Sequence, residues 1–402
     1  MTHRSSAYSA ARHGAVPFWR DVRVLRVIAQ LIFVIAVLAT GAWLLGNYRD
    51  WLAERNLTFS YRFLRLEASF DLAEGIPFKA TDSYARAFLV GVVNTLRVAS
   101  VGIVLATLLG LVTGVARLSR NWLVSHIASV YIELIRNTPL LAQLFFLYFA
   151  VIIKLPQLKT GDEITALTLP GPTYLSNRGL AMPWPRPSGS FGSWWPFLVA
   201  SLVVAVVLWI LRARGVQRTG RPSFSFLWVA IAFFAIPVVG WFLVPGNPLI
   251  LDVPVIEGLR AKGGTILSPE YVALTLGLVV YTGAFIAEVV RAGIMAVPKG
   301  QTEAARAQGF AEMQILRLIV LPQALRVIIP PIISQYLNLT KNSSLAVGIG
   351  FLDLYAVART MLNQSGRVVE VFLMIMAAYL STSLFISLIM NIVNRRIQIV
   401  ER

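Results

Sequence analysis

The sequence predicts an all-α fold, a polytopic membrane helical bundle with about eight transmembrane helices. Apolar residues make up 57% of the 402 residues and the mean hydropathy is +0.70, whereas soluble domains are about 45–50% apolar. Several runs of about 20 residues carry few or no charges, which is the length that a helix needs to cross a bilayer. These runs place the spans near residues 27–46, 87–116, 122–153, 195–211, 226–244, 271–293, 323–348 and 369–393.

Most of the net charge of +17 lies in the segments on one side of the predicted spans. If the N-terminus is inside, the inside segments hold 19 Lys and Arg residues against 4 Asp and Glu, and the outside segments hold 14 against 12. The positive-inside rule therefore puts both termini in the cytoplasm. Because the excess charge reports orientation, no nucleic-acid partner is expected.

The first span needs a separate argument, because a basic stretch followed by an apolar run can also be a secretory signal. Hydrophobicity continues through Trp43, Leu44 and Leu45, which favours an uncleaved anchor helix. Two long outside segments, 47–86 and 154–194, show no soluble-domain pattern. The second is rich in Pro, Gly and Trp, so we expect an ordered or semi-ordered loop at the headgroup level.

Sites that would make the chain an enzyme are missing from the sequence. It has no cysteine, and His3, His13 and His126 are too scattered to form a metal site, so no metal is expected. The sequence contains no Gly-Lys dipeptide, which excludes a phosphate-binding P-loop, and it contains neither H-E-x-x-H nor G-x-S-x-G. Any ATP that drives the protein must therefore bind to a partner.

A polar segment between the sixth and seventh spans predicts a short cytoplasmic helix. Ala304, Ala305 and Ala307 are good helix formers, and Glu303 is expected in the first turn, where a carboxylate suits the helix dipole. Gly309 can then turn the chain in a left-handed conformation. Pro322 marks the start of the next span.

This segment resembles the EAA loop of binding-protein-dependent ATP-driven importers: EAA, three residues, Gly, nine residues, then I-x-L-P. The resemblance implies the type I permease fold of ABC importers and a helix that couples to two ATPase subunits, which bind ATP and Mg. It also implies that the chain is a permease subunit without enzyme activity. The residues that take the coupling role by position are Glu303, Ala304, Ala305, Gly309, Ile319, Leu321 and Pro322.

Neighbouring stretches look like the permeases for polar amino acids. The resemblance covers about residues 80–153 and 271–400, and the matching stretches are Asn94–Arg97, Glu133–Leu141, Ala287–Gly293 and Leu321–Arg326. The added spans are similar to those of the larger permeases of general L-amino-acid transport systems. This similarity implies a second related permease in a heterodimer, a periplasmic amino-acid-binding protein, and a multi-pass location in the lipid of the bacterial inner membrane.

The resemblance also implies a division of the chain. Residues 1–79 would hold a cytoplasmic tail, the anchor helix and a periplasmic loop. Residues 80–400 would form the permease domain, with an inserted two-helix region and periplasmic loops at about 154–270.

Several ionisable residues fall within the spans, where charges usually face the bundle interior. Glu133 and Arg136 are spaced to form a structural ion pair on one helix face, and Pro139 should kink that helix. Arg136, with the adjacent Thr138, could instead line a substrate path. Glu288 could line that path or pair with Arg291 or Arg97.

The seventh span carries a polar stripe, Gln335, Asn338 and Asn342, with Lys341 alongside. These side chains could bind the ammonium and carboxylate of an amino acid or bond to a neighbouring helix. Lys341 could also extend to the membrane surface. Pro330 and Pro331 should bend this helix into two halves.

Two other function classes fit a polytopic membrane protein. One is an ion-gradient-driven secondary transporter or channel, which would need no ATPase and would work in vesicles without ATP. The other is a sensor or assembly scaffold that transports nothing. The EAA-like spacing favours the importer.

Overall fold

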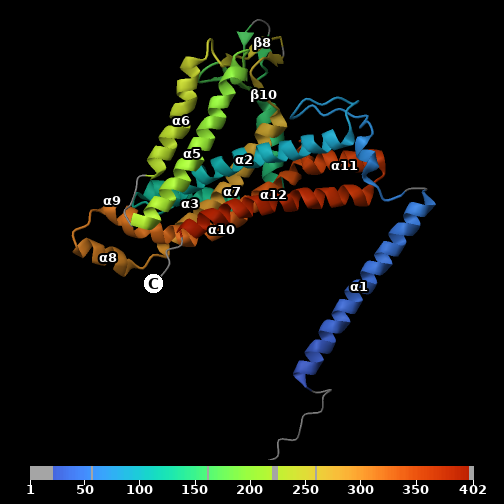
Figure 1. The fold of residues 1–402 in the computed structure, drawn as a ribbon, viewed down its shortest axis with the longest axis horizontal. Coiled ribbons are helices and arrows are strands. Elements are labelled where there is room, and N and C mark those ends of the chain that lie inside the picture. Colours follow the sequence, from blue (N-terminus) through green and yellow to red (C-terminus); the bar gives the residue numbers. More distant parts are fainter. Residues whose placement is uncertain (1–20, 56–57, 161–162, 220–224, 259, 398–402) are drawn as a thin grey trace, which may run out of the picture. The chain divides into compact units, whose positions relative to one another are not determined.

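The computed structural model describes residues 21–55, 58–160, 163–219, 225–258 and 260–397, in two compact units, Met1–Phe63 and Leu64–Arg402. Within this described part, six helices are long and apolar enough to cross a membrane, and one bent helix pair passes the same test together. With the shorter apolar helix Leu227–Leu243, each predicted span falls on a helical segment. The predicted membrane helical bundle is confirmed (Figure 1).

The first unit contains one long apolar helix, α1 (Val22–Glu54), which includes the predicted first span. Asp21 caps this helix, because its carboxylate accepts a hydrogen bond of 2.8 Å from the backbone N–H of Arg23. The predicted cytoplasmic tail falls on residues 1–20 for the most part, and these lie outside the described residues.

The second unit holds the remaining helices. They are α2 (Tyr84–Arg117), α3 (Trp122–Arg136), α4 (Leu140–Phe145), α5 (Phe191–Thr219), α6 (Ser225–Leu243), α7 (Pro269–Met295), α8 (Lys299–Ala307), α9 (Glu312–Ile315), α10 (Leu321–Asn342), α11 (Leu354–Ser365) and α12 (Val368–Ile397). Short 3₁₀ segments occupy Tyr61–Arg65, Ile152–Lys154 and Ser343–Ile349, and π-helical segments occupy Phe146–Val151 and Leu316–Val320.

The bundle is centred on α2 and α7, which approach closely along a row of small residues on α2. The row is Gly102, Ala106, Gly110 and Gly114, spaced four apart so that all lie on one helix face. A Cβ at Gly110 would lie 2.6 Å from the Cβ of Ile286, and a Cβ at Gly114 would lie 2.7 Å from a backbone oxygen of α7. Only glycine therefore permits this contact.

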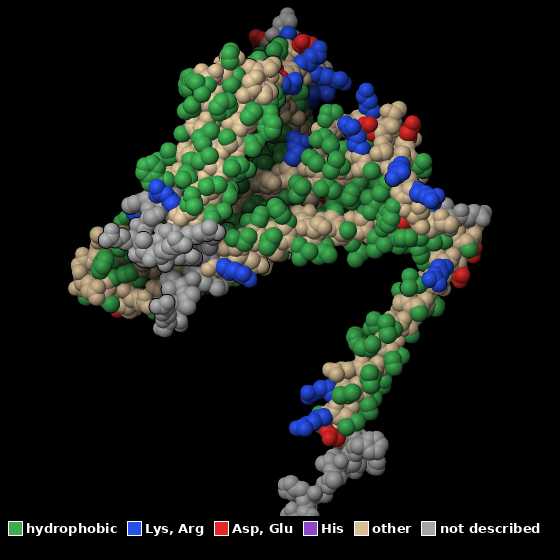
Figure 2. Space-filling view, viewed as in Figure 1, with side chains coloured by type: hydrophobic (Ala, Val, Ile, Leu, Met, Phe, Trp, Pro, Cys, Tyr) green, Lys and Arg blue, Asp and Glu red, His purple; other side chains and the backbone are tan. Residues whose placement is uncertain are grey.

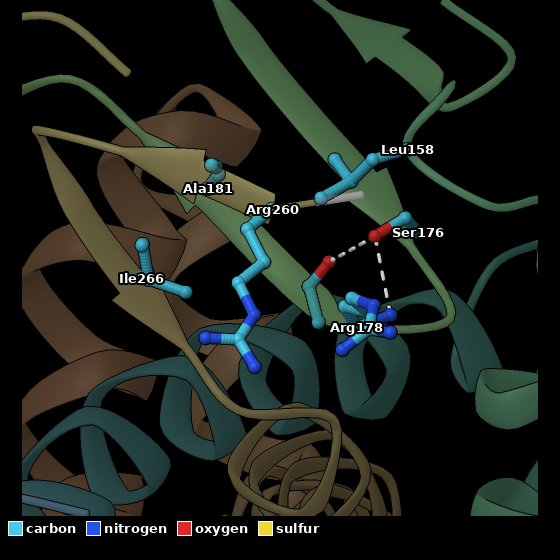
Figure 3. A pocket seen from close by; sticks show the side chains of 8 residues that line it. Leu158, Ser176, Arg178, Ala181, Arg260 and Ile266 are labelled. Carbon is cyan, nitrogen blue, oxygen red and sulfur yellow. Dashed lines mark hydrogen bonds between the residues drawn. The ribbon is translucent and has the colours of Figure 1, made fainter. Parts of the chain in front are cut away.

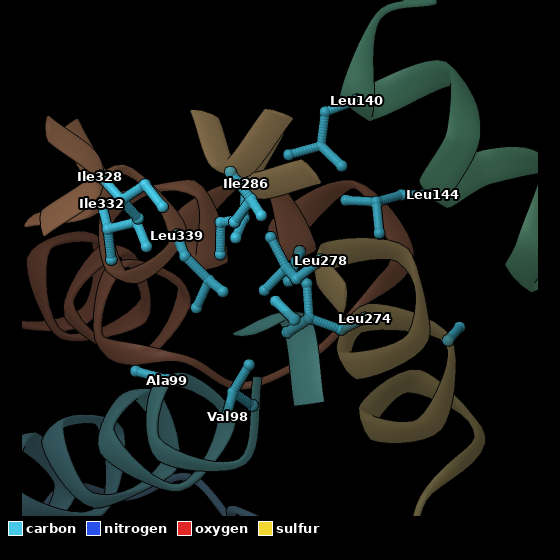
Figure 4. Packing of buried hydrophobic residues seen from close by; sticks show 14 of the residues in the cluster. Val98, Ala99, Leu140, Leu144, Leu274, Leu278, Ile286, Ile328, Ile332 and Leu339 are labelled. Carbon is cyan, nitrogen blue, oxygen red and sulfur yellow. The ribbon is translucent and has the colours of Figure 1, made fainter. Parts of the chain in front are cut away.

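Helices α10 and α4 complete the core around this pair. Figure 4 shows Val98 and Ala99 of α2 and Leu278 of α7 facing Leu339 of α10 and Leu144 of α4. These five side chains are 4% exposed or less. In a bilayer, such van der Waals packing holds helices together, since lipid is as apolar as leucine.

Polar contacts fix α11 against α2. Asn94 of α2 is fully buried and donates a hydrogen bond of 2.8 Å to the backbone oxygen of Leu352. The hydroxyl of Thr95 accepts a hydrogen bond of 3.0 Å from the backbone N–H of Leu354. Asp353 caps α11, and burial raises the pKa of its carboxyl to about 6.

The third predicted span, residues 122–153, is not one continuous helix. α3 ends at Arg136, α4 begins at Leu140, and the two are bent by 105°. Pro139 precedes the first residue of α4 and has no backbone N–H with which to continue α3. The break at Pro139 was expected, but the angle of 105° between the two helices makes this span a bent helix pair.

The double proline of α10 does not divide the helix. α10 runs through Pro330 and Pro331 without a break, so the predicted two halves are not seen. Neighbouring helices and local adjustments can satisfy the backbone groups that proline frees in a membrane helix. The irregular turn of this span lies earlier, in the π-helical segment Leu316–Val320.

Helices α5 and α6 form a hairpin that ends at a set of small sheets (Figure 1). The largest sheet has the antiparallel order β10-β5-β4-β3, and β10 pairs Thr265 with Met182. The strands are β1 (Lys159–Thr160), β2 (Glu163–Ile164), β3 (Leu167–Leu169), β4 (Thr173–Ser176), β5 (Gly179–Met182), β6 (Trp184–Pro187), β7 (Leu249–Asp252), β8 (Val255–Glu257), β9 (Arg260–Lys262) and β10 (Thr265–Leu267). The predicted loop 154–194 is thus partly a sheet, and the fold is not purely α.

Replacing Gly110 with valine should separate α2 from α7, because the new Cβ would lie 2.6 Å from the Cβ of Ile286. Overpacking of this kind typically costs about 1–3 kcal/mol. We expect a lower thermal unfolding temperature in detergent. Leu108→Val is the matched control, since this side chain of the same helix is 56% exposed. Equal melting of the two variants would contradict the packing argument.

Candidate functional site

The predicted short helix is α8, and its end is built by Gly309. Gly309 has a φ of +83°, the left-handed conformation that glycine adopts without strain. Its N–H donates to the backbone oxygen of Arg306 at 2.9 Å, and the N–H of Phe310 donates to that of Ala305 at 3.1 Å. These two bonds form a Schellman motif, which stops the helix and reverses the chain.

Two side-chain contacts hold α8 against the following segments. Gln323 of α10 donates a hydrogen bond of 2.6 Å to Gln301 of α8. Arg306 Nε lies 2.8 Å from Glu312 Oε1 of α9. Because both contacts cross the turn at Gly309, α8, α9 and the start of α10 form one connected unit.

The residues of the predicted coupling motif divide between the inside and the outside of this unit. Ala305 is buried, whereas Glu303 and Ala304 are exposed. Glu303 lies in the second turn of α8 and not the first, because the helix begins at Lys299. α8 therefore presents a carboxylate and a small apolar side chain on its free surface.

The second half of the motif, Ile319, Leu321 and Pro322, lies in the segment that follows α8 and α9. Ile319 lines a cavity of about 430 Å³ with Ala304 and Ala305. Leu321 begins α10 and Pro322 follows as its second residue, which agrees with the predicted helix start. The full lining is Gln301, Ala304, Ala305, Gln308, Leu318, Ile319 and Gln323.

The polar stripe of α10 lines a second cavity. Gln335, Asn338 and Asn342 share a cavity of about 260 Å³ with Tyr281, Thr282 and Phe285 of α7. Amide groups both donate and accept hydrogen bonds, so this lining can hold an ammonium and a carboxylate at once. The α7 wall of this cavity could not be predicted from the sequence, because nothing in a single helix shows which face meets α10.

None of the other four residues of the predicted substrate path lines this cavity, although Arg136 and Glu288 adjoin its α7 wall. The guanidinium of Arg136 lies over the Phe285 ring, 5.3 Å from its centroid. Glu288 is the next residue of the same α7 face. The hydroxyl of Thr138, in the break between α3 and α4, donates a hydrogen bond of 2.8 Å to the backbone oxygen of Leu134. Lys341 is exposed and does not line the cavity.

Glu288 is the centre of an ion cluster that joins three helices. Arg117 of α2 lies 2.6 Å from its carboxylate, Arg291 of α7 lies 2.5 Å away, and Arg136 of α3 lies 3.9 Å away. Glu133 pairs with Arg117 at 3.2 Å.

The prediction that Glu133 pairs with Arg136 is therefore wrong, because each of the two has another partner. Among the described residues, Glu133 pairs with Arg117 and Arg136 pairs with Glu288. Arg117 is near Glu133 only because α2 and α3 fold together, so helix spacing alone could not find it. The predicted pairing of Glu288 with Arg291 is confirmed, and Arg97 pairs with Glu74 at 3.8 Å instead.

Comparison with known proteins gives the family. Residues 210–399 match the family "Binding-protein-dependent transport system inner membrane component". The general L-amino acid transport system permease protein AapQ of Rhizobium johnstonii is 43% identical and covers 95% of this chain and 94% of its own. The Escherichia coli protein YhdX is also 43% identical, with 100% of both chains covered.

Two further likenesses are weaker. The glutamate/glutamine/aspartate/asparagine transport system permease protein BztB of Rhodobacter capsulatus is 37% identical over 95% of this chain and 96% of its own. A crystal structure of an amino acid ABC transporter with histidines shares 21% identity with this chain at a TM-score of 0.45, over 78% of this chain and 95% of that one. The family match and the two relatives at 43% identity show that this chain belongs to the inner membrane components of binding-protein-dependent transport systems. It is a polytopic ABC importer permease of the type I fold.

Proposed function

We propose that this chain is the permease subunit of an amino-acid importer that is driven by two ATPase subunits through α8. The observation that carries the proposal is the geometry of α8: its Glu303 and Ala304 are exposed, while Ala305 and the turn at Gly309 anchor it to the bundle. An exposed helix that is anchored to the bundle can be displaced by a bound subunit and can transmit that movement to the membrane helices. ATP and Mg would bind to that subunit.

The position of α7 supports the proposed orientation. Its 27 residues, about 40 Å of helix, connect the sheets at one end to α8 at the other. If α8 contacts cytoplasmic ATPases, the sheets lie outside, where a periplasmic binding protein delivers its cargo. Both termini are then cytoplasmic, and the protein lies in the bacterial inner membrane.

The cavity between α7 and α10 is the proposed substrate contact. It combines amide groups with the aromatic side chains of Tyr281 and Phe285. Asn338 is exposed, so this face of the subunit is open. A second, related permease would close it, and the proposed assembly is a heterodimer with the substrate path between the two subunits.

Coupling can be tested at Gly309, with Gly192 of α5 as the control. Neither glycine has an atom within 4 Å of the position of a Cβ, but of the two only Gly309 has a positive φ. Gly309→Val should strain the turn, at a cost of about 1–2 kcal/mol, and lower ATP-driven uptake severalfold. Gly192→Val should transport like the wild type. Uptake into proteoliposomes and co-purification of the ATPase measure both effects.

A second variant separates coupling from folding. Ala304→Arg puts a bulky cation on the exposed surface of α8 and should abolish ATPase binding while the melting temperature is unchanged. If this variant still bound the ATPase and transported normally, α8 would not be the coupling helix. Uptake by the wild type without ATP would favour an ion-gradient transporter instead.

The substrate contact can be tested at Asn338. Asn338→Leu removes an amide that lines the cavity, and we expect at least a tenfold loss of uptake at low substrate concentration, since a hydrogen bond to a charged group contributes about 1.5–3 kcal/mol. Lys341→Met is the control, because Lys341 does not line the cavity. Normal uptake by Asn338→Leu would exclude this cavity from the substrate path.

The ion cluster has a different proposed role, which is to hold α2, α3 and α7 together. Glu288→Gln would leave three arginines without their shared carboxylate and should lower the free energy of unfolding by about 1–3 kcal/mol. Glu133→Gln, at a carboxylate that is 65% exposed, should cost less than about 1 kcal/mol. Thermal unfolding in detergent compares the two. A larger loss for Glu133→Gln would reverse the assignment.

A further inference from the structure

One pocket of the sheets contains two arginines that have no acidic partner among the residues that the structure describes. It has a volume of about 260 Å³, and its polar side chains are Ser176, Arg178 and Arg260. Figure 3 shows the side chains of Arg178 and Arg260 at the same pocket, with Arg178 below the Ser176 hydroxyl. Leu158, Ala181 and Ile266 line the rest of it.

Other basic side chains of the same sheets have acidic partners. Arg186 Nε lies 2.8 Å from Asp252 Oδ2, and Lys262 Nζ lies 2.5 Å from Glu257 Oε2. Among the described residues, no ion pair or hydrogen bond engages the side chain of Arg178 or Arg260. The pocket is therefore positively charged.

The pocket exists because two segments separated by the α5–α6 hairpin fold together. Arg178 lies in the two-residue turn between β4 and β5, where its backbone N–H bonds the buried hydroxyl of Ser176 at 3.2 Å. Arg260 begins β9, on the far side of the hairpin in sequence. β10 then joins the two segments by pairing with β5.

We propose that this pocket receives an aspartate or glutamate side chain of the external binding protein when that protein docks. The proposal rests on the proposed function, which places the sheets outside and supplies the partner. A guanidinium matches a carboxylate with two parallel hydrogen bonds, and arginine is enriched in protein interfaces. Figure 2 shows several Lys and Arg side chains over the sheets, with fewer Asp and Glu side chains among them, so an acidic partner would also be attracted to this surface.

The position of the pocket favours a protein side chain over a lipid headgroup. A lipid headgroup would approach along the membrane helices. Every residue that lines the pocket, however, comes from the sheets and the segments between them, and none from a membrane-spanning helix.

The test is docking of the binding protein to the complete importer in lipid nanodiscs, followed as ATP hydrolysis against binding-protein concentration. The double variant Arg178→Ala with Arg260→Ala should raise the half-saturating concentration about tenfold or more, and should weaken its salt dependence. Hydrolysis without the binding protein should stay at the wild-type rate. Lys262→Ala, which removes one charge that is already paired, is the matched control and should change the half-saturating concentration little.

The possible outcomes separate this proposal from the proposed function. If the binding protein does not stimulate the wild-type complex, the proposed function fails. If it stimulates wild type and double variant with the same half-saturation, the docking site is wrong and the importer function stands. An equal loss in Lys262→Ala would point to general charge attraction, and a loss seen only with anionic lipid would point to a headgroup site. Either result would overturn the proposal.

Discussion

The close contact of α2 with α7 is the interaction on which the rest of the structure depends. Water drives no helix association inside a bilayer, so the helices must gain their attraction from van der Waals contact over a short distance. Gly110 and Gly114 allow that distance, because a Cβ at either position would collide with α7. Leu339 of α10 then packs against Gly102 on the same row of α2. One row of small residues thus places both helices that line the polar cavity.

With its position fixed, α7 connects the three regions to which we assign functions. Its first residue follows β10, so this end carries the sheets. Tyr281 and Phe285 in its middle form one wall of the cavity. Glu288 near its other end binds arginines of α2, α3 and α7 itself, and α8 begins only four residues after α7 ends. A displacement of α8 would therefore reach the cavity through one short connection and one rigid helix.

The arginines near the two ends of α7 differ in their ion pairing. At the α8 end, Glu288 shares its carboxylate among several arginines, which suits a structural junction of helices. In the sheets, Asp252 and Glu257 each have a basic partner, whereas Arg178 and Arg260 have none among the described residues. Unmatched guanidinium groups on a surface are available to a partner, while matched ones hold the fold. The same residue type thus serves assembly in one place and recognition in the other.

The sequence by itself determined the membrane spans, the α8 turn at Gly309 and the family, because hydrophobic run length and backbone preference are local properties. It also located the break at Pro139, although not its angle of 105°. Only the tertiary structure decided that Arg117 pairs with Glu133, that Tyr281 faces the α10 stripe, and that β10 pairs with β5. Each of these contacts joins residues far apart in the chain. Their proximity depends on how the helices pack, which no periodicity within one segment specifies.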